Sequence, residues 1–267
     1  MADEPAENIS GGASGGGQPA TFDPATAGTR AERIVDQLGS RYWQTAYGGR
    51  PAFECLVRTI LSQNTSDKAS QPAHDALVDR YGEGDLVDAL AEAEQSMLAE
   101  TISGAGLYNQ KSEVIIDAAS EIRDEFDDAA TFDAFVKTES PETVRSRLLE
   151  IHGVGPKTAD CVLLFAGGRG GVFPVDTHVH RIARRLGLAD PAADHEGVRA
   201  ALEAAVPAEK CGFGHTAMIQ FGREYCTART PACLDGPEAC PLYDDCDRVG
   251  VDESSETVVD PAETDRH

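Results

Sequence analysis

The chain has 267 residues, 41% of them hydrophobic and 26% charged, and its 46 acidic and 23 basic side chains give a formal net charge of −23. This composition excludes a disordered polyelectrolyte, and the longest apolar run, Cys161 to Ala166, is too short to span a bilayer. The chain is long enough for one large domain or two ordinary ones.

Lysine is scarce among the basic residues. Of the 23 basic side chains, 18 are arginines and five are lysines: Lys68, Lys111, Lys137, Lys157 and Lys210. Acidic excess with few lysines is typical of proteins kept soluble in multimolar salt, where the Debye length falls to about 3 Å. We therefore predict a halophilic source, with an ordinary acidic protein as the alternative. High salt also removes much of the objection that an acidic surface repels nucleic acid.

The N-terminus, MADEPAENIS, lacks the basic and apolar segments of a secretory signal, and the seven cysteines are odd in number. These features predict an intracellular, reducing environment. Residues 1–28 are rich in Gly, Ser and acid, and residues 248–267 are acidic, so both ends are expected to be disordered tails.

Between the tails the apolar spacing is helical and no run alternates as a strand would, which predicts an all-α fold. Ser140 before Pro141, and Asp194, are expected helix caps. The glycine-rich segment 167–171 and the pair Gly48 and Gly49 are expected breaks. Helices are predicted over residues 31–43, 51–63, 67–81, 86–91, 94–103, 110–126, 141–151, 157–166, 177–186, 195–206 and 213–225.

A glycine hairpin, IHGVGPKTAD at residues 151–160, separates two of the predicted helices. Gly153 and Gly155 can take positive φ and carry no side chain, so backbone amides there can approach a phosphate closely. The alternative is an ordinary turn between helices. Lys157 lies in the first turn of the next helix, where the helix dipole disfavours an ammonium and favours a nucleophilic amine. A solvated lysine beside a DNA phosphate is the competing interpretation.

A carboxylate stands at the start of a later helix, in PVDTHVHR at residues 174–181. Asp176 is explained either as a helix cap or as the carboxylate that stabilises an oxocarbenium-like transition state in glycosidic cleavage. The basic residues that follow it, Arg181, Arg184 and Arg185, either face DNA or pair with carboxylates.

Four of the seven cysteines, Cys226, Cys233, Cys240 and Cys246, follow the pattern C-x6-C-x6-C-x5-C near the C-terminal end. In a reducing compartment such a group predicts a metal site, either a [4Fe–4S] cluster or tetrahedral zinc. The spacings are wider than those of common zinc ribbons, which favours iron–sulfur. The remaining cysteines, Cys55, Cys161 and Cys211, are expected to be small buried residues.

These motifs, in this order, resemble the endonuclease III family of helix-hairpin-helix iron–sulfur DNA glycosylases. The resemblance covers roughly residues 30–247 and includes ILSQNTSD at residues 60–67 and GREYC at residues 222–226. It implies a two-lobed all-α fold, with a six-helix barrel over residues 50–170 that ends in the hairpin. The cluster lobe would combine residues 29–49 with residues 171–247, and DNA would bind in the groove between the lobes.

The resemblance also assigns roles to single residues. Lys157 matches the catalytic lysine, Asp176 the catalytic aspartate, and the four late cysteines the ligands of a [4Fe–4S] cluster. The implied DNA contacts come from the hairpin, from the turn after residue 62 and from the helix that follows Asp176. They are Gly153, Val154, Gly155, Thr158, Gln63, Asn64 and Arg181, and either Gln63 or Asn64 would be inserted beside the flipped base.

The implied activity is that of a bifunctional DNA glycosylase and AP lyase that removes oxidised pyrimidines in base excision repair. A base is flipped out, Lys157 forms a Schiff base and β-elimination nicks the strand. The expected partner is double-stranded DNA with a damaged base or an abasic site, bound by a monomer in a prokaryotic cytoplasm, at the nucleoid and not at a membrane. The alternatives are a monofunctional mismatch adenine or thymine glycosylase, and a non-catalytic helix-hairpin-helix DNA-binding module with a zinc staple.

Two positions depart from the family pattern. Six residues separate Cys233 from Cys240 where the family has two, so four additional residues must loop out without disturbing the ligands. Pro156 stands before the lysine where a basic residue is common, which removes one amide and one phosphate contact.

Overall fold

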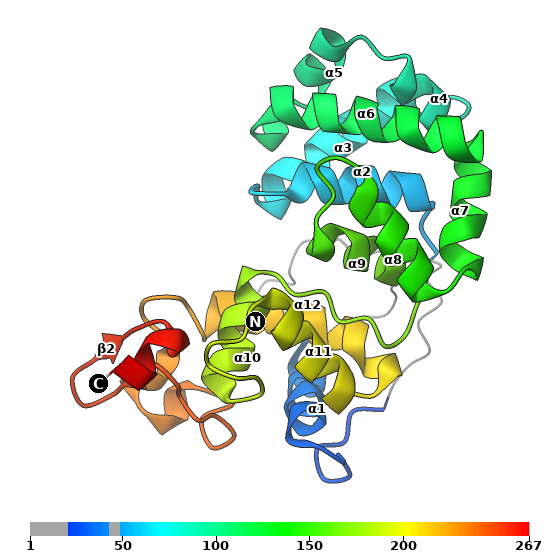
Figure 1. Cartoon of the computed structure of the whole chain (residues 1–267). Coiled ribbons are helices and arrows are strands. Elements are labelled where there is room, and N and C mark those ends of the chain that lie inside the picture. Colours follow the sequence, from blue (N-terminus) through cyan, green and yellow to red (C-terminus); the bar gives the residue numbers. More distant parts are fainter. Residues whose placement is uncertain (1–20, 43–48, 267) are drawn as a thin grey trace. The chain divides into compact units, whose positions relative to one another are not determined.

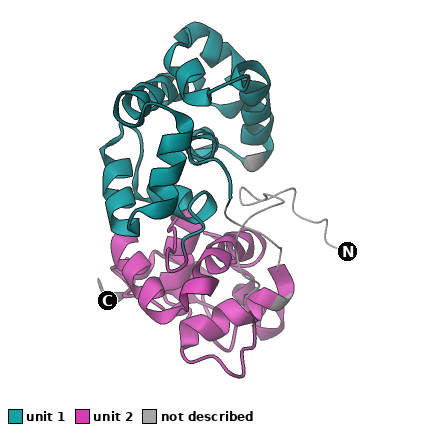
Figure 2. Cartoon of the chain, turned by 90° about the vertical axis from the view of Figure 1, so that its right-hand side faces the viewer, with its two compact units in different colours: residues 1–17, 46–169 teal, residues 18–45, 170–267 magenta. Residues whose placement is uncertain are grey.

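The computed structural model describes residues 21–42 and 49–266. This described part contains twelve α-helices, four 3₁₀ turns and one pair of two-residue strands (Figure 1). It divides into two compact units, one within residues 46–169 and one formed by residues 18–45 and 170–267 (Figure 2). Below, unit 1 means residues 49–169 and unit 2 means residues 21–42 with 170–266. The predicted tail at residues 1–20, and the predictions for Trp43 and Gly48, lie outside the described residues.

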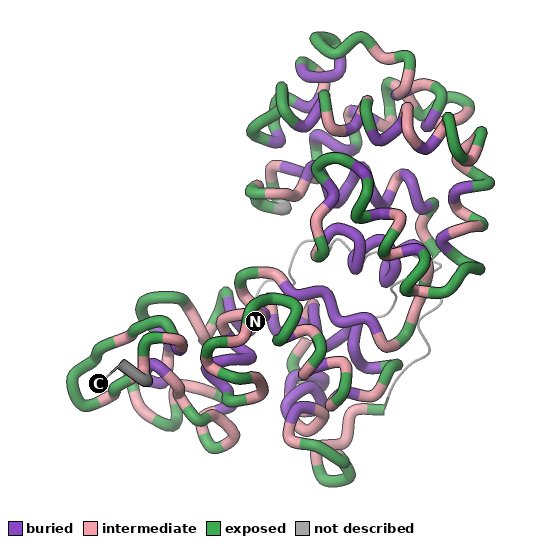
Figure 3. Tube along the Cα trace, viewed as in Figure 1, coloured by how far each residue is buried: buried purple, intermediate pink, exposed green. Residues whose placement is uncertain are grey.

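Unit 1 is built around two helices that are apolar on nearly every side. In α2 (Ala52–Ser62) the side chains of Phe53, Leu56 and Leu61 are at most 1% exposed, and α9 (Pro156–Phe165) is buried from Thr158 onward (Figure 3). A helix that is apolar all round belongs inside a core. The helices around them are α3 (Asp67–Tyr81), α4 (Leu86–Ala91), α5 (Gln95–Thr101), α6 (Tyr108–Phe126), α7 (Ala129–Thr138) and α8 (Pro141–Glu150).

Side chains cap several of these helices where the sequence predicts a cap. The Ser140 hydroxyl accepts a hydrogen bond from the Thr143 amide at 3.1 Å, and Asp194 accepts one from the Gly197 amide at 2.8 Å. Each bond satisfies an amide that has no partner within its helix. Both predicted caps are therefore confirmed.

Unit 2 joins the N-terminal helix to the C-terminal half of the chain. In α1 (Arg30–Tyr42) the side chains of Ile34, Val35 and Leu38 are at most 1% exposed and lie on the face that packs on α12 (Ala208–Glu224). The other helices are α10 (Thr177–Leu186) and α11 (His195–Ala205). Another side of α1 contacts a segment that is distant in sequence, residues 245–247. There Arg30 pairs with Asp247 at 2.8 Å, and Arg33 donates to Asp245 at 3.0 Å.

One α-helix was not predicted. Helix α7 begins after Asp128, which accepts a hydrogen bond from the Thr131 amide at 2.7 Å, and it buries Phe132 and Val136 completely. These two side chains are four residues apart and so share one helical face. Ten residues with only two core positions give too short a pattern to distinguish from a loop.

The prediction of disordered ends is wrong for the described residues. Phe22 packs on Phe213 with ring centroids 4.4 Å apart. Near the C-terminus β1 (Val251–Asp252) pairs with β2 (Thr257–Val258), and η4 (Pro261–Arg266) follows. The acidic composition of residues 248–267 suggested a tail, because composition does not reveal which carboxylates bind basic side chains elsewhere in the chain. Asp260, between the strand and η4, binds Arg184 with both carboxylate oxygens, at 2.8 and 3.0 Å.

Within the described residues, no helix has the length and apolar character that crossing a membrane requires.

Candidate functional site

The glycine hairpin lies between α8 and α9, and its two glycines have different conformations. Gly153 has φ +79°, and a Cβ atom there would lie 2.6 Å from Cγ1 of Val114 on α6. Gly155 is extended, with φ −94° and open space where its Cβ would be. Gly153 is therefore required for the turn and for its close approach to α6. Because Gly155 has no side chain, the backbone at the start of α9 stays accessible.

The N-terminus of α9 has no cap. Gly155 offers no side chain, Pro156 has no amide hydrogen, and the amides of Lys157 and Thr158 have no acceptor in the described part of unit 1. Free first-turn amides together with the helix dipole form a site for an anion such as a phosphate. Val154 is turned inward, since its side chain is 6% exposed and its amide donates to the Ile151 carbonyl at 3.1 Å.

Lys157 is the second residue of α9 and is half-buried. Its ammonium makes no hydrogen bond or ion pair within the described part of unit 1. The nearby Asp160, one helical turn on and 1% exposed, is held by Arg145 of α8 at 2.7 Å. This buried pair joins the two helices on either side of the hairpin, and it leaves the amine of Lys157 available for chemistry.

Gln63 and Asn64, the two candidates for insertion beside a flipped base, lie in different environments. The side-chain amide of Gln63 donates from Nε2 to the Gly153 carbonyl at 3.2 Å and to the Thr158 hydroxyl at 3.1 Å. These bonds join the end of α2 to the hairpin. Asn64 is exposed and has φ +51°. The Thr158 side chain is 3% exposed and serves this internal contact.

A second turn of unit 1 presents apolar side chains that the sequence analysis missed. It follows η1 (Ser103–Ala105), and in it Leu107 has φ +50° and is 56% exposed, while the next residue, Tyr108, is 40% exposed. A left-handed conformation is costly for leucine, and such strain is concentrated at functional sites. The Thr65 hydroxyl donates to the Ala105 carbonyl and so links this turn to the turn that holds Asn64.

Asp176 caps α10 in unit 2. Its Oδ1 accepts a hydrogen bond from the Val179 amide at 2.8 Å, which confirms the expected cap. The side chain is half-buried, and its second oxygen has no partner in the described part of unit 2. One carboxylate can therefore hold the helix start and still present an oxygen to a positive charge.

The arginines after Asp176 donate to groups inside unit 2. Arg181 donates to the Cys226 carbonyl at 2.9 Å, and Arg184 binds Asp260. Arg185 donates to the carbonyls of Thr227 and Ala228 at 2.6 and 2.7 Å. Of the two interpretations, pairing with a carboxylate is confirmed for Arg184. The other two guanidinium groups hold the loop that begins at Cys226.

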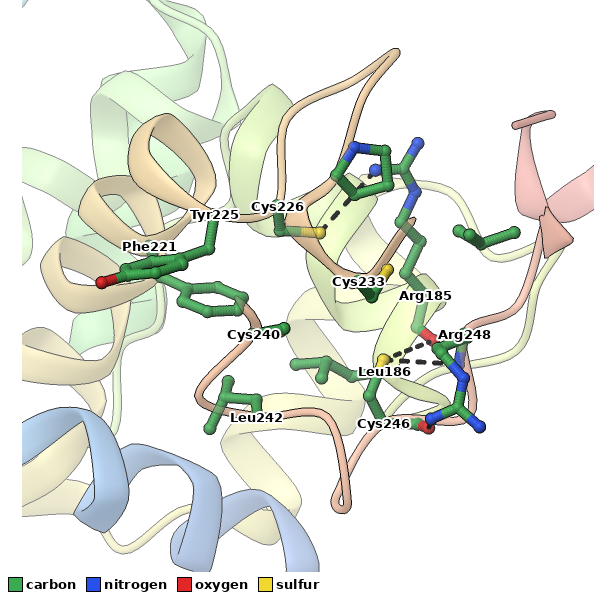
Figure 4. Close-up of a pocket in the computed structure, with 12 residues that line it drawn as sticks. Arg185, Leu186, Phe221, Tyr225, Cys226, Cys233, Cys240, Leu242, Cys246 and Arg248 are labelled. Atoms are coloured by element: carbon green, nitrogen blue, oxygen red, sulfur yellow. Dashed lines mark hydrogen bonds between the residues drawn. The ribbon is translucent and has the colours of Figure 1, made fainter. Parts of the chain in front are cut away.

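The four late cysteines line one pocket in unit 2, together with Phe221, Tyr225 and Leu242 (Figure 4). In the described residues no three His, Cys, Asp or Glu side chains converge as a single metal ion requires. This arrangement does not match a tetrahedral zinc site, in which all ligands meet at one ion. The thiolate ligands of a four-iron cluster each bind a different iron, so their sulfurs need not meet at one ion.

Hydrogen bonds to sulfur reach two of the four thiols. Arg185 Nη1 lies 3.7 Å from the Cys226 sulfur, and the Arg248 amide donates to the Cys246 sulfur at 3.3 Å. Burial raises the pKa of Cys233 to about 11 and that of Cys246 to about 12, so both are neutral thiols at pH 7 when no metal is bound. Metal binding at this site must therefore release protons.

The longer segment between Cys233 and Cys240 folds compactly. It forms η2 (Ala232–Asp235) and η3 (Pro237–Ala239), which are joined at Gly236 with φ +105°. Both cysteines still line the pocket. As expected, the other three cysteines are buried: Cys55, Cys161 and Cys211 are at most 1% exposed.

Comparison with known proteins gives two family matches. Residues 57–208 match the HhH-GPD superfamily of base excision DNA repair proteins, and residues 226–246 match the iron–sulfur binding domain of endonuclease III. Endonuclease III of Thermotoga maritima is 31% identical over 195 residues, which are 73% of this chain and 82% of that protein. Endonuclease III of Sulfolobus acidocaldarius is 31% identical over 197 residues, 74% of this chain and 82% of the relative.

Among solved structures, a trapped endonuclease III–DNA covalent intermediate superposes with a TM-score of 0.66 at 26% identity, covering 82% of this chain and 96% of that one. The family matches cover both the hairpin region and the four cysteines, in the order that the sequence motifs predict. This chain belongs to the endonuclease III family of HhH-GPD DNA glycosylases and carries the family's iron–sulfur binding domain.

Proposed function

We propose that this protein is a bifunctional DNA glycosylase and AP lyase that excises oxidised pyrimidines from double-stranded DNA. The observation that carries the proposal is the unpaired amine of Lys157 beside an uncapped helix N-terminus. A glycosylase that uses water as nucleophile has no need of an amine there. The likeness to a trapped covalent enzyme–DNA intermediate supports the same chemistry.

DNA would be gripped by the hairpin and opened by the two turns of unit 1. The free amides of Lys157 and Thr158 would bind a phosphate without adding a basic side chain. Leu107 would enter the base stack as an apolar wedge, with Asn64 or Gln63 filling the space that the base leaves. A damaged base is cheaper to extrude because it stacks or pairs poorly.

The chemistry would begin when the amine nitrogen of Lys157 attacks the sugar carbon that carries the base. The glycosidic C–N bond breaks as the new C–N bond forms, and the proton that the lysine nitrogen loses balances the charge of the departing base. The bond from the same carbon to the ring oxygen then breaks, which opens the sugar and gives a protonated imine. Loss of a proton from the adjacent carbon expels the 3′ phosphate by β-elimination and breaks the strand on the 3′ side. The second carboxylate oxygen of Asp176 would stabilise the positive charge that develops on the sugar.

The [4Fe–4S] cluster would be held by Cys226, Cys233, Cys240 and Cys246. When bound it would cross-link the segment between the first and last of these cysteines to the end of α12. Arg185 and the Arg248 amide would donate hydrogen bonds to two of its sulfur ligands.

Borohydride trapping on duplexes that each carry one lesion tests the proposal. The wild-type protein should become covalently attached to DNA with an oxidised pyrimidine or an abasic site. Lys157→Ala should not, provided that circular dichroism shows it folded. Lys137→Ala is the matched control, because Lys137 pairs with Asp133 on α7 and lies outside the proposed site. Base release by wild type without trapping would instead indicate a monofunctional glycosylase, and DNA binding without base release or strand cleavage would indicate a binding module.

A further inference from the structure

Lys111 is a buried lysine that the proposed chemistry does not use. It lies in the first turn of α6, is 4% exposed, and donates three hydrogen bonds from Nζ. The acceptors are the Leu61 carbonyl at 2.7 Å, the Thr65 hydroxyl at 2.8 Å and the Ala105 carbonyl at 2.9 Å. All three N–H groups of the ammonium are thereby satisfied. No carboxylate among the described side chains contacts it, and burial lowers its pKa to about 8.

The three acceptors belong to two separate turns of unit 1. Leu61 and Thr65 flank the turn between α2 and α3, and Ala105 ends η1 just before α6. Each turn carries an exposed residue in the left-handed region, Asn64 with φ +51° and Leu107 with φ +50°. Strained conformations persist only where the surroundings hold them. Here the hydrogen bond from Thr65 to Ala105 and the Lys111 ammonium, which binds both turns, hold them together.

The choice of lysine at this position follows from geometry. The chain has 18 arginines and five lysines, so the use of lysine at position 111 needs a structural explanation. An ammonium places three donors around one nitrogen, which matches three acceptors converging from different directions. A guanidinium is planar and larger, and its donors point within one plane.

We propose that Lys111 is a positioning residue for base extrusion, which holds the Asn64 turn and the Leu107 turn together as one preformed element that enters the DNA stack. The inference rests on the proposed function, because it assigns to these turns the extrusion step of that reaction. Lys111 touches neither substrate nor the reacting atoms, and it acts through the two turns.

The decisive variant is Lys111→Met, which keeps the length of the side chain and removes every donor. Displacement of reacting or positioning groups by about 1 Å can cost about 10²-fold in rate. We therefore expect single-turnover excision of an oxidised pyrimidine to fall by about 10²-fold. Cleavage at a preformed abasic site, which has no base to unstack, should stay within about threefold of wild type. Lys137→Met, the same change at an ion-paired surface lysine, should alter neither rate.

Extrusion itself can be followed by the fluorescence of 2-aminopurine placed beside the lesion. The signal should rise when wild type binds and should be largely absent with Lys111→Met at saturating protein. An equal loss of both activities, or an unchanged excision rate, would overturn the proposal. Lys111→Arg keeps the charge and several donors, so it should retain more excision activity than Lys111→Met.

Two further measurements keep the test decisive. If Lys111→Met fails to fold, Thr65→Val removes one acceptor of Lys111, together with the hydrogen bond from Thr65 to Ala105, with little change of shape. Because both contacts join the two turns, it should lower excision more than abasic-site cleavage. If wild type cleaves no abasic DNA, the proposed function fails. The 2-aminopurine comparison then judges Lys111 alone, and an equal fluorescence rise in wild type and variant rejects its role.

Discussion

Replacing Gly153 with alanine perturbs the hairpin at the one position where the structure leaves no room for a side chain. The residue has φ +79°, and the new Cβ would lie 2.6 Å from Cγ1 and 2.9 Å from Cγ2 of Val114. The left-handed conformation costs an L-residue about 1–2 kcal/mol, and forcing an extra methyl into a packed site costs about 1–3 kcal/mol. We expect the free energy of unfolding to fall by about 3 kcal/mol.

Gly155→Ala is the matched control two residues away. Gly155 has φ −94°, and no atom lies within 4 Å of the position its Cβ would take. Alanine is a poorer N-cap than glycine but restricts the unfolded chain, so the net change in unfolding free energy should stay within about 1 kcal/mol. Its methyl group would nevertheless occupy part of the open space at the start of α9, which a DNA phosphate would have to enter to reach the free amides. We therefore expect Gly155→Ala to fold normally and to bind abasic DNA more weakly.

Urea unfolding followed by circular dichroism measures the first effect, and fluorescence anisotropy at a fixed salt concentration measures the second. Equal loss of stability in the two variants would refute the distinction drawn between the glycines. Unchanged DNA affinity in Gly155→Ala would refute the assignment of the open helix start to phosphate binding.

The purified protein should be brown and contain iron. The variant Cys246→Ala should lose that iron, whereas Cys55→Ala should keep it. Elemental analysis that finds stoichiometric zinc and no iron would contradict the cluster assignment. Hydrogen bonding to Arg184 lowers the pKa of Asp260 below its unfolded value of about 3.9, so this pair stabilises the fold above that pH and loses its effect as pH falls through the folded pKa. Asp260→Asn should therefore reduce stability at pH 7 and flatten its dependence between about pH 5 and 3, and parallel curves for the two proteins would exclude this. Cleavage should rise with KCl into the molar range and helicity should fall in dilute buffer, whereas a rate that falls steadily above about 50 mM would reject the halophilic interpretation.

The sequence predicted the features that depend on local chemistry. Ser140 and Asp194 cap helices because their side chains reach amides three residues on, a relation that spacing alone reveals. Helix α10 begins and ends where predicted, between the Asp176 cap and Gly187. The spacing of the four cysteines predicted that they share one site, and all four line one pocket. Catalytic roles for Lys157 and Asp176 and the individual DNA contacts stay predictions.

What could not be predicted depends on partners distant in the chain. Arg184 could be read as facing DNA until Asp260, 76 residues later, was seen to bind it. The exposure of Leu107 depends on a left-handed turn that no sequence period reveals. The ordered C-terminal end was missed because its acidic residues were counted without their basic partners.

The contacts of α1 also constrain the order in which the protein can be completed during synthesis. Its buried apolar face and its Arg30 and Arg33 side chains find their partners on α12 and at residues 245–247, roughly two hundred residues later. The ribosome therefore finishes unit 1 while α1, already exposed outside the exit tunnel, still has nothing to pack against. A stop codon before Ala208 would remove α12 and leave the apolar face of α1 available for aggregation. The cysteine pocket, which is lined by residues between Arg185 and Val251, is likewise enclosed only after unit 1 has been made.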